Sequence, residues 1–550
     1  MKAPNWLSIR LRDLAVGFLR TKLFHKIACT AAALIAVQFM GGLPVLACQS
    51  GGKPITLAEA LNSTLEHHPL LEARRWDVVS ARGSKQEAAG QFDTLYQSGV
   101  GQQNQDNPLS QLERAQLGLG PQAADSLTAV TAFNFNISKL FRSGISVSSY
   151  MNLNRNSDNL VNVFGSSASQ MGVQMIVPLL RNRGASLVTA TETAAGIEVS
   201  SRQLDLQQAR EQLLANTATS YWTLVAARQH LSVAIGSEER GRKLLETVQA
   251  LITADHLPRN EIHEVTANLA DRTGNRIAAE QEVNRARAQL ALDMGLAPDQ
   301  VLDAGDPADG FPPLDGAISG LNDQSVVYYV EQAATHRADI EAAEKREKQA
   351  RILYVAALNS VRPQLNLQLG TGYSQLRDRG GAGQFFSSPF TSLHRPDFQA
   401  GFVYQFAHNN DGAKGQVLQA QAKMREAELQ RSELRRQIAA AVTVALGNVR
   451  SSVQRLKSTN EAVEAFQRSL DGEREKFGLG QSSLTELLTV EDRLTVALSS
   501  QVDAQEAYAL ALAGLRLATG TLFPLSGTTD SVNSNVFQTI PGSSGTREPE

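Results

Sequence analysis

His263 and Glu264 come nearest to a catalytic motif in this sequence, because they could begin an HExxH zinc site. The fifth position of that motif is Ala267 and not a second histidine, so the zinc site is incomplete. His67 and His68 are adjacent, and we expect them at the end of a first helix, with metal binding as the minor alternative. No GxGxxG motif opens a helix after a strand, and no GxxxxGK[ST] loop occurs. The sequence therefore predicts no enzyme and no cofactor.

The remaining candidate residues lie at two chain reversals. DHLPR (255–259) contains a proline and GLGQS (478–482) contains two glycines, and both can turn a chain between antiparallel helices. Glu261 and Glu264 follow the first reversal, and Glu486 follows the second. Acids in the first turn of a helix complement its dipole, so a solvated helix face is one interpretation of all three.

Long helices must position these reversals. No proline lies between Pro178 and Pro258 or between Pro396 and Pro524, and an interior proline would cost a helix about 3 kcal/mol. Apolar and small residues recur there at steps of four and three, as in a coiled-coil seam. The seam residues are Leu214, Ala218, Tyr221 and Val225; Ala279, Val283, Ala286 and Leu290; and Val490, Leu494, Ala497, Gln501, Ala504, Tyr508, Ala511 and Leu515. We expect one helix from about Ala190 to Thr253, which would be roughly 100 Å long.

Between the helical stretches the period changes to two. Apolar residues alternate with Asn, Ser and Gln around 133–137, 145–153, 171–177, 365–369 and 398–406. Strands with one apolar and one small-polar face suit a barrel that has lipid outside and water inside. A half-exposed soluble sheet alternates in the same way, so the strands alone do not decide.

The chain contains an internal repeat. HPLLEA (68–73) corresponds to RADIEA (337–342) at an offset of 269, and Gly295 corresponds to Gly520 at an offset of 225. The extra residues of the first half fall in its strand region. Each half therefore predicts helix, strands, helix, turn and helix.

The N-terminus predicts export. Residues 1–27 carry six basic groups and one acid, and residues 27–47 are uncharged and end in Val-Leu-Ala before Cys48. This pattern is typical of a secretory signal, with a transmembrane anchor as the alternative. Cys48 is a candidate for lipidation after a lipobox-like VLAC; cleavage before an unmodified cysteine is the other possibility. Without residues 1–47 the net charge would move from −3 to about −8, which gives no reason to expect nucleic-acid binding.

The order and duplication of these segments resemble the TolC family of outer-membrane efflux proteins over roughly residues 52–525. The segments that carry the resemblance are ITLAEALNSTLEHHPLLEARR (55–75), VPLLRNRGA (177–185), SYWTLVAARQHLSVA (220–234), EIHEVTANLADRTGNRIAAEQEVNRARAQLALDMG (261–295), HRADIEAAEKREKQAR (336–351) and SSLTELLTVEDRLTVA (482–497). The resemblance implies a homotrimer in which each copy gives four strands to one shared barrel, continued by helices as a periplasmic tunnel. The long first strand region, 92–178, departs from that pattern and could hold an extra hairpin or long extracellular loops.

The resemblance also implies roles for the reversals. They would form the periplasmic mouth and meet an adaptor protein, with Leu257, Pro258, Leu479 and Gly480 as docking candidates; capping of the coiled coil is the alternative. Glu486, and Glu261 through the repeat, match a pore-constricting acid of the family, and Glu264 is a further candidate. Threefold symmetry would turn each acid into a cation-attracting ring.

We therefore expect a mainly α-helical protein with a membrane β-barrel part, built from long coiled-coil helices and two repeats per chain. The expected organisation is a signal peptide (1–47), a first repeat (48–300), a linker (301–324), a second repeat (325–524) and a flexible tail (525–550). The expected function is a passive outer-membrane exit duct of a tripartite efflux or type I secretion system, extending into the periplasm. Its expected partners are two further copies, an adaptor (membrane fusion) protein, an inner-membrane pump and outer-membrane lipid. An exported coiled-coil scaffold or adhesin without a pore is the alternative.

Overall fold

The computed structural model describes residues 54–120, 125–297, 300, 305–314, 325–378, 396–522 and 534–541. The chain divides into two units, residues 1–50 and 51–550, and every described residue belongs to the second. The expected signal segment and Cys48 lie outside the described residues.

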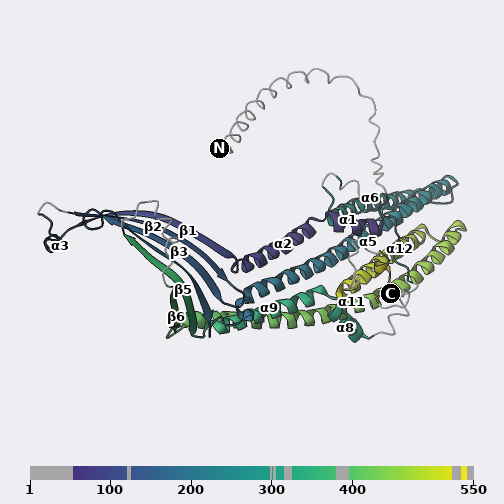
Figure 1. The fold of residues 1–550 in the computed structure, drawn as a ribbon. Helices are drawn as coiled ribbons and strands as arrows, with labels where there is room; N and C mark the ends of the chain where they lie inside the picture. The colour runs from purple at the N-terminus through teal and green to yellow at the C-terminus, as the bar shows by residue number, and fades with distance from the viewer. Residues whose placement is uncertain are drawn as a thin grey trace, which may run out of the picture. The chain divides into compact units, whose positions relative to one another are not determined.

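The first half of the described chain begins with two short helices and ends with two long ones, with strands between them (Figure 1). Its elements are α1 (Leu57–His67), α2 (Pro69–Gly90), β1 (Thr94–Pro108), α3 (Gln111–Gln116), β2 (Asp125–Leu140), β3 (Ser146–Asp158), β4 (Ser166–Pro178), α4 (Ala185–Val188), α5 (Ala190–Thr253) and α6 (Glu261–Asp293). The predicted long helix from Ala190 to Thr253 is confirmed as α5.

The second half has the same order with fewer strands. Its elements are α8 (Val326–His336), α9 (Ala338–Ser360), β5 (Gln364–Asp378), β6 (Asp397–Gln405), α11 (Asp411–Gly478) and α12 (Leu484–Thr519), followed by the 3-10 helix η3 (Ser534–Gln538). Among the described residues, no helix combines the length and apolar content needed to cross a membrane.

Local sequence explains where the short helices begin and end. Thr56 and Glu59 form a capping box at the start of α1, and Pro69 occupies the first turn of α2. His67 is the last residue of α1, and His68 lies between the two helices, where its Nδ1 accepts a hydrogen bond from the Leu70 amide. The expected position of this histidine pair at the end of the first helix is confirmed.

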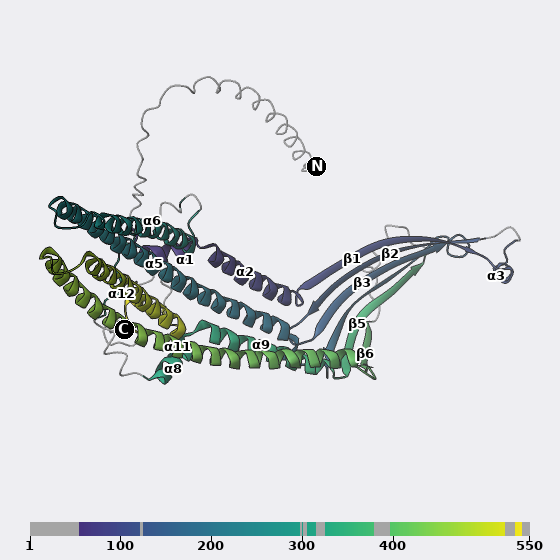
Figure 2. The ribbon, with the colours of Figure 1, turned by 180° about the vertical axis from the view of Figure 1, so that it is seen from behind.

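All six strands form one antiparallel sheet in the order β1-β2-β3-β4-β5-β6. The strands lie at one end of the long helices, a placement that is the same from both sides of the molecule (Figures 1 and 2). The sheet of this chain has six strands and not the four that the resemblance implies, because the first half alone supplies β1 to β4. Of the two structures proposed for residues 92–178, the extra hairpin is the one found.

The helices pack through three apolar clusters. One surrounds Trp222 and Tyr221 of α5, and a second surrounds Tyr329 of α8 and Tyr508 of α12. The expected seam residues of α5, Leu214, Ala218, Tyr221 and Val225, are all buried, since small and large side chains alternate against α6 and α1. The third cluster lies near the helical tips and belongs to the candidate site.

The expectation of a flexible tail from residue 525 does not hold for 534–541. Phe537 is fully buried in the cluster around Trp222, and Ile540 is buried in the cluster around Tyr508. The Arg516 guanidinium of α12 donates to the Thr539 carbonyl oxygen at 3.0 and 3.1 Å. Two buried apolar side chains among small polar residues therefore pin this segment to both halves.

Candidate functional site at the helical tips

Two helical hairpins end in the predicted reversals. The first passes from α5 to α6, and Asp255 adopts a left-handed conformation with φ 57° directly after α5. The second passes from α11 to α12, and Gly480 takes φ 71°. Helices commonly end through one left-handed residue, and only glycine does so without a steric cost, so the second tip is the less strained.

Glu486 completes the capping box at the start of α12, whose N-cap residue is Ser483. Its Oε2 accepts from the Ser483 amide at 3.0 Å, and the Ser483 Oγ accepts from the Glu486 amide at 3.2 Å, which makes a capping box. Hydrogen bonds from the Ser483 amide, then from the hydroxyls of Ser483 and Ser482, hold the pKa of this carboxyl below its usual value. The helix-start interpretation of this acid thus has a specific structural basis.

The first tip is built differently. Glu261 is the first residue of α6, whereas Glu486 is the third of α12, so the two acids that correspond in sequence occupy different helical positions. Glu264 is exposed, and its Oε1 lies 3.4 Å from the Thr485 hydroxyl of α12. Glu264 therefore faces the second hairpin, while Glu486 satisfies its own helix.

The proposed docking residues differ in how exposed they are. Leu257 is partly buried, packed against an apolar cluster at the tips. Leu479 is 67% exposed, and Pro258 and Gly480 are exposed. Leu479 and Pro258 are the apolar side chains of this set that remain exposed, whereas Leu257 packs against the apolar cluster at the tips.

The apolar tip cluster joins the two hairpins. All four helices contribute buried side chains to it, which are Leu244 and Val248 of α5, Val265 of α6, Leu470 and Phe477 of α11, and Leu484, Leu487, Leu488 and Leu494 of α12. Burial of each leucine contributes about 1.5–3 kcal/mol relative to exposure. The tips are therefore held together by a core of their own.

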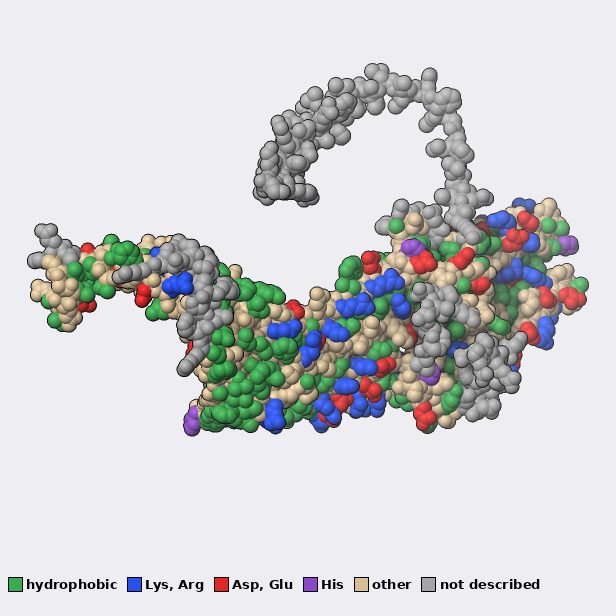
Figure 3. Space-filling view, viewed as in Figure 1, with side chains coloured by type: hydrophobic (Ala, Val, Ile, Leu, Met, Phe, Trp, Pro, Cys, Tyr) green, Lys and Arg blue, Asp and Glu red, His purple; other side chains and the backbone are tan. Residues whose placement is uncertain are grey.

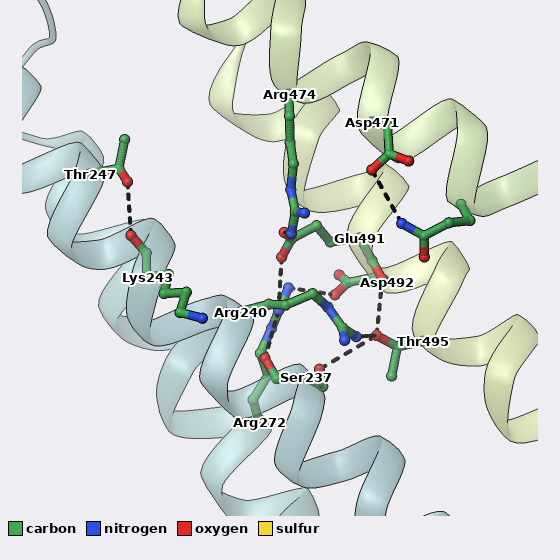
Figure 4. Close-up of polar contacts among 11 residues, drawn as sticks. Ser237, Arg240, Lys243, Thr247, Arg272, Asp471, Arg474, Glu491, Asp492 and Thr495 are labelled. Atoms are coloured by element: carbon green, nitrogen blue, oxygen red, sulfur yellow. Dashed lines mark hydrogen bonds and ion pairs between the residues drawn. The ribbon is translucent and has the colours of Figure 1, made fainter.

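A buried ion network lies beside this cluster (Figure 4). Arg272 of α6 donates through Nη1 to Glu491 Oε2 of α12 at 2.9 Å, and Arg474 of α11 donates to Glu491 Oε1 at 2.8 Å. Arg272 also donates to Asp492 Oδ1 at 3.2 Å and to the Ser237 carbonyl of α5 at 3.1 Å. One carboxylate thus bridges the two hairpins.

Burial makes this network expensive to break. Arg272 and Glu491 are only 4% and 2% exposed. Arg240 of α5 donates to the Thr495 hydroxyl of α12 at 3.0 Å, and desolvation lowers the pKa of Arg240 despite the nearby Glu491 charge. Removing one partner of a buried pair costs about 3–5 kcal/mol because the other charge stays buried and unpaired.

The network was not predicted from the sequence, although a signal for it exists. Arg272 stands one heptad before the seam residue Ala279, where an apolar side chain is expected. Glu491 directly follows the seam residue Val490. A charge at a seam position is buried and requires a counter-charge. For Arg272 that counter-charge is Glu491 of the other hairpin.

The site can act mechanically. Within the described ranges no group of three or more His, Cys, Asp or Glu side chains could hold a metal ion. What the residues form is a tie between two hairpins, an exposed apolar tip and three acids near the helix starts. Such an arrangement can hold the hairpins closed or release them.

Known proteins share this sequence pattern and this fold. Residues 329–521 match the family described as Outer membrane efflux protein. The Outer membrane protein TolC of Escherichia coli (strain K12) is 25% identical over 386 residues, which cover 66% of this chain and 71% of that protein. The CmeC outer membrane channel of Campylobacter jejuni matches with a TM-score of 0.60 at 13% identity, over 86% of this chain and 87% of that one. The outer membrane protein VceC of Vibrio cholerae matches with a TM-score of 0.60 at 16% identity, over 84% and 96%.

The fold and these similarities define an outer-membrane channel protein. Residues 329–521 carry the domain of the outer membrane efflux protein family, the chain is similar to TolC over about two thirds of its length, and its place is the outer membrane. This family is one of channels and not of enzymes.

Proposed function

We propose that three copies of this chain form a passive exit duct that crosses the outer membrane and continues into the periplasm. An adaptor (membrane fusion) protein and an inner-membrane pump complete a tripartite efflux or type I secretion system around it. The two halves of each chain act as structural repeats, 48–300 and 325–524, joined by the linker 301–324. Residues 1–47 direct export, and Cys48 is the lipidation candidate.

The observation that carries this proposal is the two-sided sheet set on long paired helices. Phe133, Met151, Met171, Leu369 and Phe398 lie on one face of the sheet, as their strand registers require. Asn, Gln, Ser and Gly predominate on the other face. Hydrophobic side chains gather over β5 and β6, whereas charged side chains spread along the helices (Figure 3). An apolar outer face and a polar inner face suit a sheet that has lipid on one side and a water-filled passage on the other.

The tips supply the gate of the duct. Glu261, Glu264 and Glu486 form acidic rings at the mouth, and Leu479, Gly480 and Pro258 meet the adaptor. The Arg272–Glu491 pair holds the hairpins of one copy together, so adaptor engagement has this tie to overcome. The energy for transport comes from the pump.

The test is the single-channel conductance of purified protein in planar bilayers. We compare the wild type with a Glu261→Ala/Glu486→Ala variant, and Glu464→Ala is the matched control. Glu464 is an exposed acid of α11 that pairs with Arg468 on the helix surface. We expect a cation-selective pore whose selectivity falls in the double variant and stays unchanged in the control.

Each other outcome removes a defined part of the proposal. A pore with the same selectivity in all three proteins keeps the duct and discards the acidic mouth. A folded oligomer that does not conduct contradicts the duct and favours an exported scaffold or adhesin.

A further inference from the structure

Two of the six strands in the sheet are not connected to a long helix. Four strands connect directly to helices at the same end, since β1 follows α2, β4 precedes α4 and α5, β5 follows α9, and β6 precedes α11. The hairpin β2–β3 instead reverses through residues 141–145 and has no helix of its own. It is paired on both sides, with β1 and with β4, along most of its length.

The turn of this hairpin is fixed to the helices beside it. The Arg142 guanidinium donates to both carboxylate oxygens of Glu192 on α5, at 2.9 and 2.7 Å, and lies 4.8 Å from the centre of the Phe92 ring after α2. Gly144 has φ 93°, and a Cβ there would lie 2.7 Å from the Asn182 carbonyl oxygen. Such close contacts indicate a hairpin that belongs to the sheet and not a loose insertion.

The apolar face continues without interruption across the hairpin. The register places Tyr96 of β1 beside Ile137 of β2, and Phe133 of β2 beside Leu153 of β3. Met151 of β3 then pairs with Met171 of β4. A hairpin standing in water above the membrane would not need this face, so β2 and β3 share the environment of the other four strands.

The two edges of the sheet are complementary. Within the part of the chain that the structure describes, β1 pairs only with β2 and β6 only with β5. Six antiparallel strands make β1 and β6 run in opposite directions. An edge of β1 can therefore pair with an edge of β6 from another copy in the same antiparallel manner, and a bilayer requires that such edges be paired.

We propose that β1 of each copy pairs antiparallel with β6 of the next, so that three copies close an eighteen-stranded barrel. The inference rests on the proposed trimer and adds to it the junction and the strand number. Four strands per copy would give twelve. Because barrel diameter grows roughly linearly with strand number, the membrane part is about 1.5 times as wide as a twelve-stranded one.

The junction is tested by disulfide formation between the two edge strands. Ser98→Cys on β1 is combined in turn with a cysteine at 398, 400 or 402 of β6, on the apolar face, or at 399, 401 or 403, on the polar face. Directly opposite side chains on one face have Cβ atoms about 4.5–5.5 Å apart, whereas residues on opposite faces cannot be bridged. We expect cross-links only in the first set, centred on the position that opposes Ser98.

The chain provides its own controls. Within one copy, β1 and β6 are separated by four strands, which is about 24 Å, so any cross-link joins different copies. Single-cysteine variants account for the native Cys29 and Cys48. A variant lacking residues 125–158 connects β1 to β4 at the end away from the helices and leaves both edge strands in place. It should therefore give the same cross-links as the full chain.

The outcomes separate this inference from the proposed function. Closed rings of three linked chains, with alternation along β6, support the β1–β6 junction in a trimer, and the six strands in the sheet of each copy then make eighteen. Rings of two chains contradict the strand number. If the full chain conducts but gives no cross-link at any of the six positions, the duct stands and the β1–β6 junction is wrong. If only the variant lacking 125–158 cross-links, β1 does not meet β6 of the next copy while the hairpin β2–β3 is present, and the eighteen-stranded barrel is wrong.

Discussion

The two halves of the chain share their helical construction and differ in what each attaches to it. Both halves end their long helical hairpin at a glycine in the left-handed region, Gly295 with φ 73° and Gly520 with φ 68°. A Cβ on Gly295 would lie 2.7 Å from the His68 Cα, and one on Gly520 would lie 2.9 Å from the Arg337 Cγ. His68 and Arg337 occupy the same place, between the two short helices of each half.

The differences are at the two ends of the helices. The first half carries four strands and the second carries two. At the tips, the second half has the capping box and the exposed leucine, and the first half has a strained reversal and Glu264 directed at its neighbour. The shared glycines lie where the short and long helices of each half pack, and the parts that differ lie at the two ends of the helices, so the two halves diverge where this packing does not constrain them.

The largest expected effect comes from breaking the tie between the halves. Glu491→Gln leaves Arg272 charged and buried without a full counter-charge, which costs about 3–5 kcal/mol. We expect amide hydrogen exchange to rise strongly in 237–275 and 470–495 and to change little near Trp222, where a separate core lies.

The matched control is Glu464→Gln, which removes an exposed pair on the same hairpin and should leave exchange unchanged. An Arg272→Met/Glu491→Met variant should recover most of the loss, because an apolar pair of similar size has no charge to desolvate. If the Glu491→Gln and Glu464→Gln variants show the same amide hydrogen exchange, the Arg272–Glu491 pair does not join the two halves.

A second effect concerns a buried carboxyl of the first half. Glu211 of α5 is 1% exposed, and burial raises its pKa to about 7, although Gln207 and the Arg337 charge act in the opposite direction. The folded state therefore holds this proton more tightly than the unfolded state, so the destabilisation is absent below about pH 4.5 and fully present above about pH 7.

Glu211→Gln should therefore stabilise the protein by about 3 kcal/mol at pH 8 and by nothing measurable at pH 4. The melting temperature at the two pH values measures this difference. In the corresponding stretch of the second half, Arg436 is an exposed residue paired with Glu433, and Glu433→Gln should show no such pH dependence. Equal stabilisation by Glu211→Gln at both pH values would mean that this carboxyl stays ionised.

Much of the helical part could be predicted from the sequence, because its signals are local. The absence of proline and the four-three spacing of apolar residues predicted the observed ends of α5, Ala190 and Thr253. The repeat paired Gly295 with Gly520, and both glycines take a left-handed conformation at the end of a long helix. The alternation of polar and apolar residues located β2 to β6. It did not locate β1, in which Gln97, Gly99, Gly101 and Gln103 carry little apolar contrast.

The tips were harder to predict because their chemistry depends on contacts between distant residues. Glu491 and Arg272 are 219 positions apart, and nothing local identifies them as partners. Leu257 and Leu479 occupy similar places in sequence, yet only the packing of Leu257 against the apolar cluster at the tips shows that it is partly buried. Whether the three acids constrict a pore stays a prediction, since a ring of acids requires more than one copy of the chain.

The shared glycines predict equal damage in both halves. Gly295→Ala and Gly520→Ala each force a side chain into a left-handed conformation, at about 1–2 kcal/mol, and into backbone or side-chain atoms within 3 Å. Gly472→Ala in α11 meets nothing within 4 Å and should gain up to about 1 kcal/mol of helix propensity. Urea denaturation midpoints measure the three effects. A loss confined to one of the first two variants would show that the halves do not share this construction.

The smallest expected effect comes from variants that distinguish the capping box of the second tip from the charge of Glu486. Ser483→Ala removes the side-chain acceptor of the capping box and costs about 1 kcal/mol, while the Glu486 charge remains. Glu486→Gln removes the charge but keeps a side chain that serves in a capping box. If Glu486 acts only as a cap, Ser483→Ala should loosen the start of α12 in hydrogen exchange, and neither variant should alter ion selectivity. If it also forms an acidic ring, Glu486→Gln alone should lower cation selectivity in planar bilayers, while the amide hydrogens of α12 remain as protected as in the wild type.

The first half supplies the matched variant, Glu261→Gln. Because Glu261 begins α6 without a capping box, any change in ion selectivity in this variant reports the loss of charge alone.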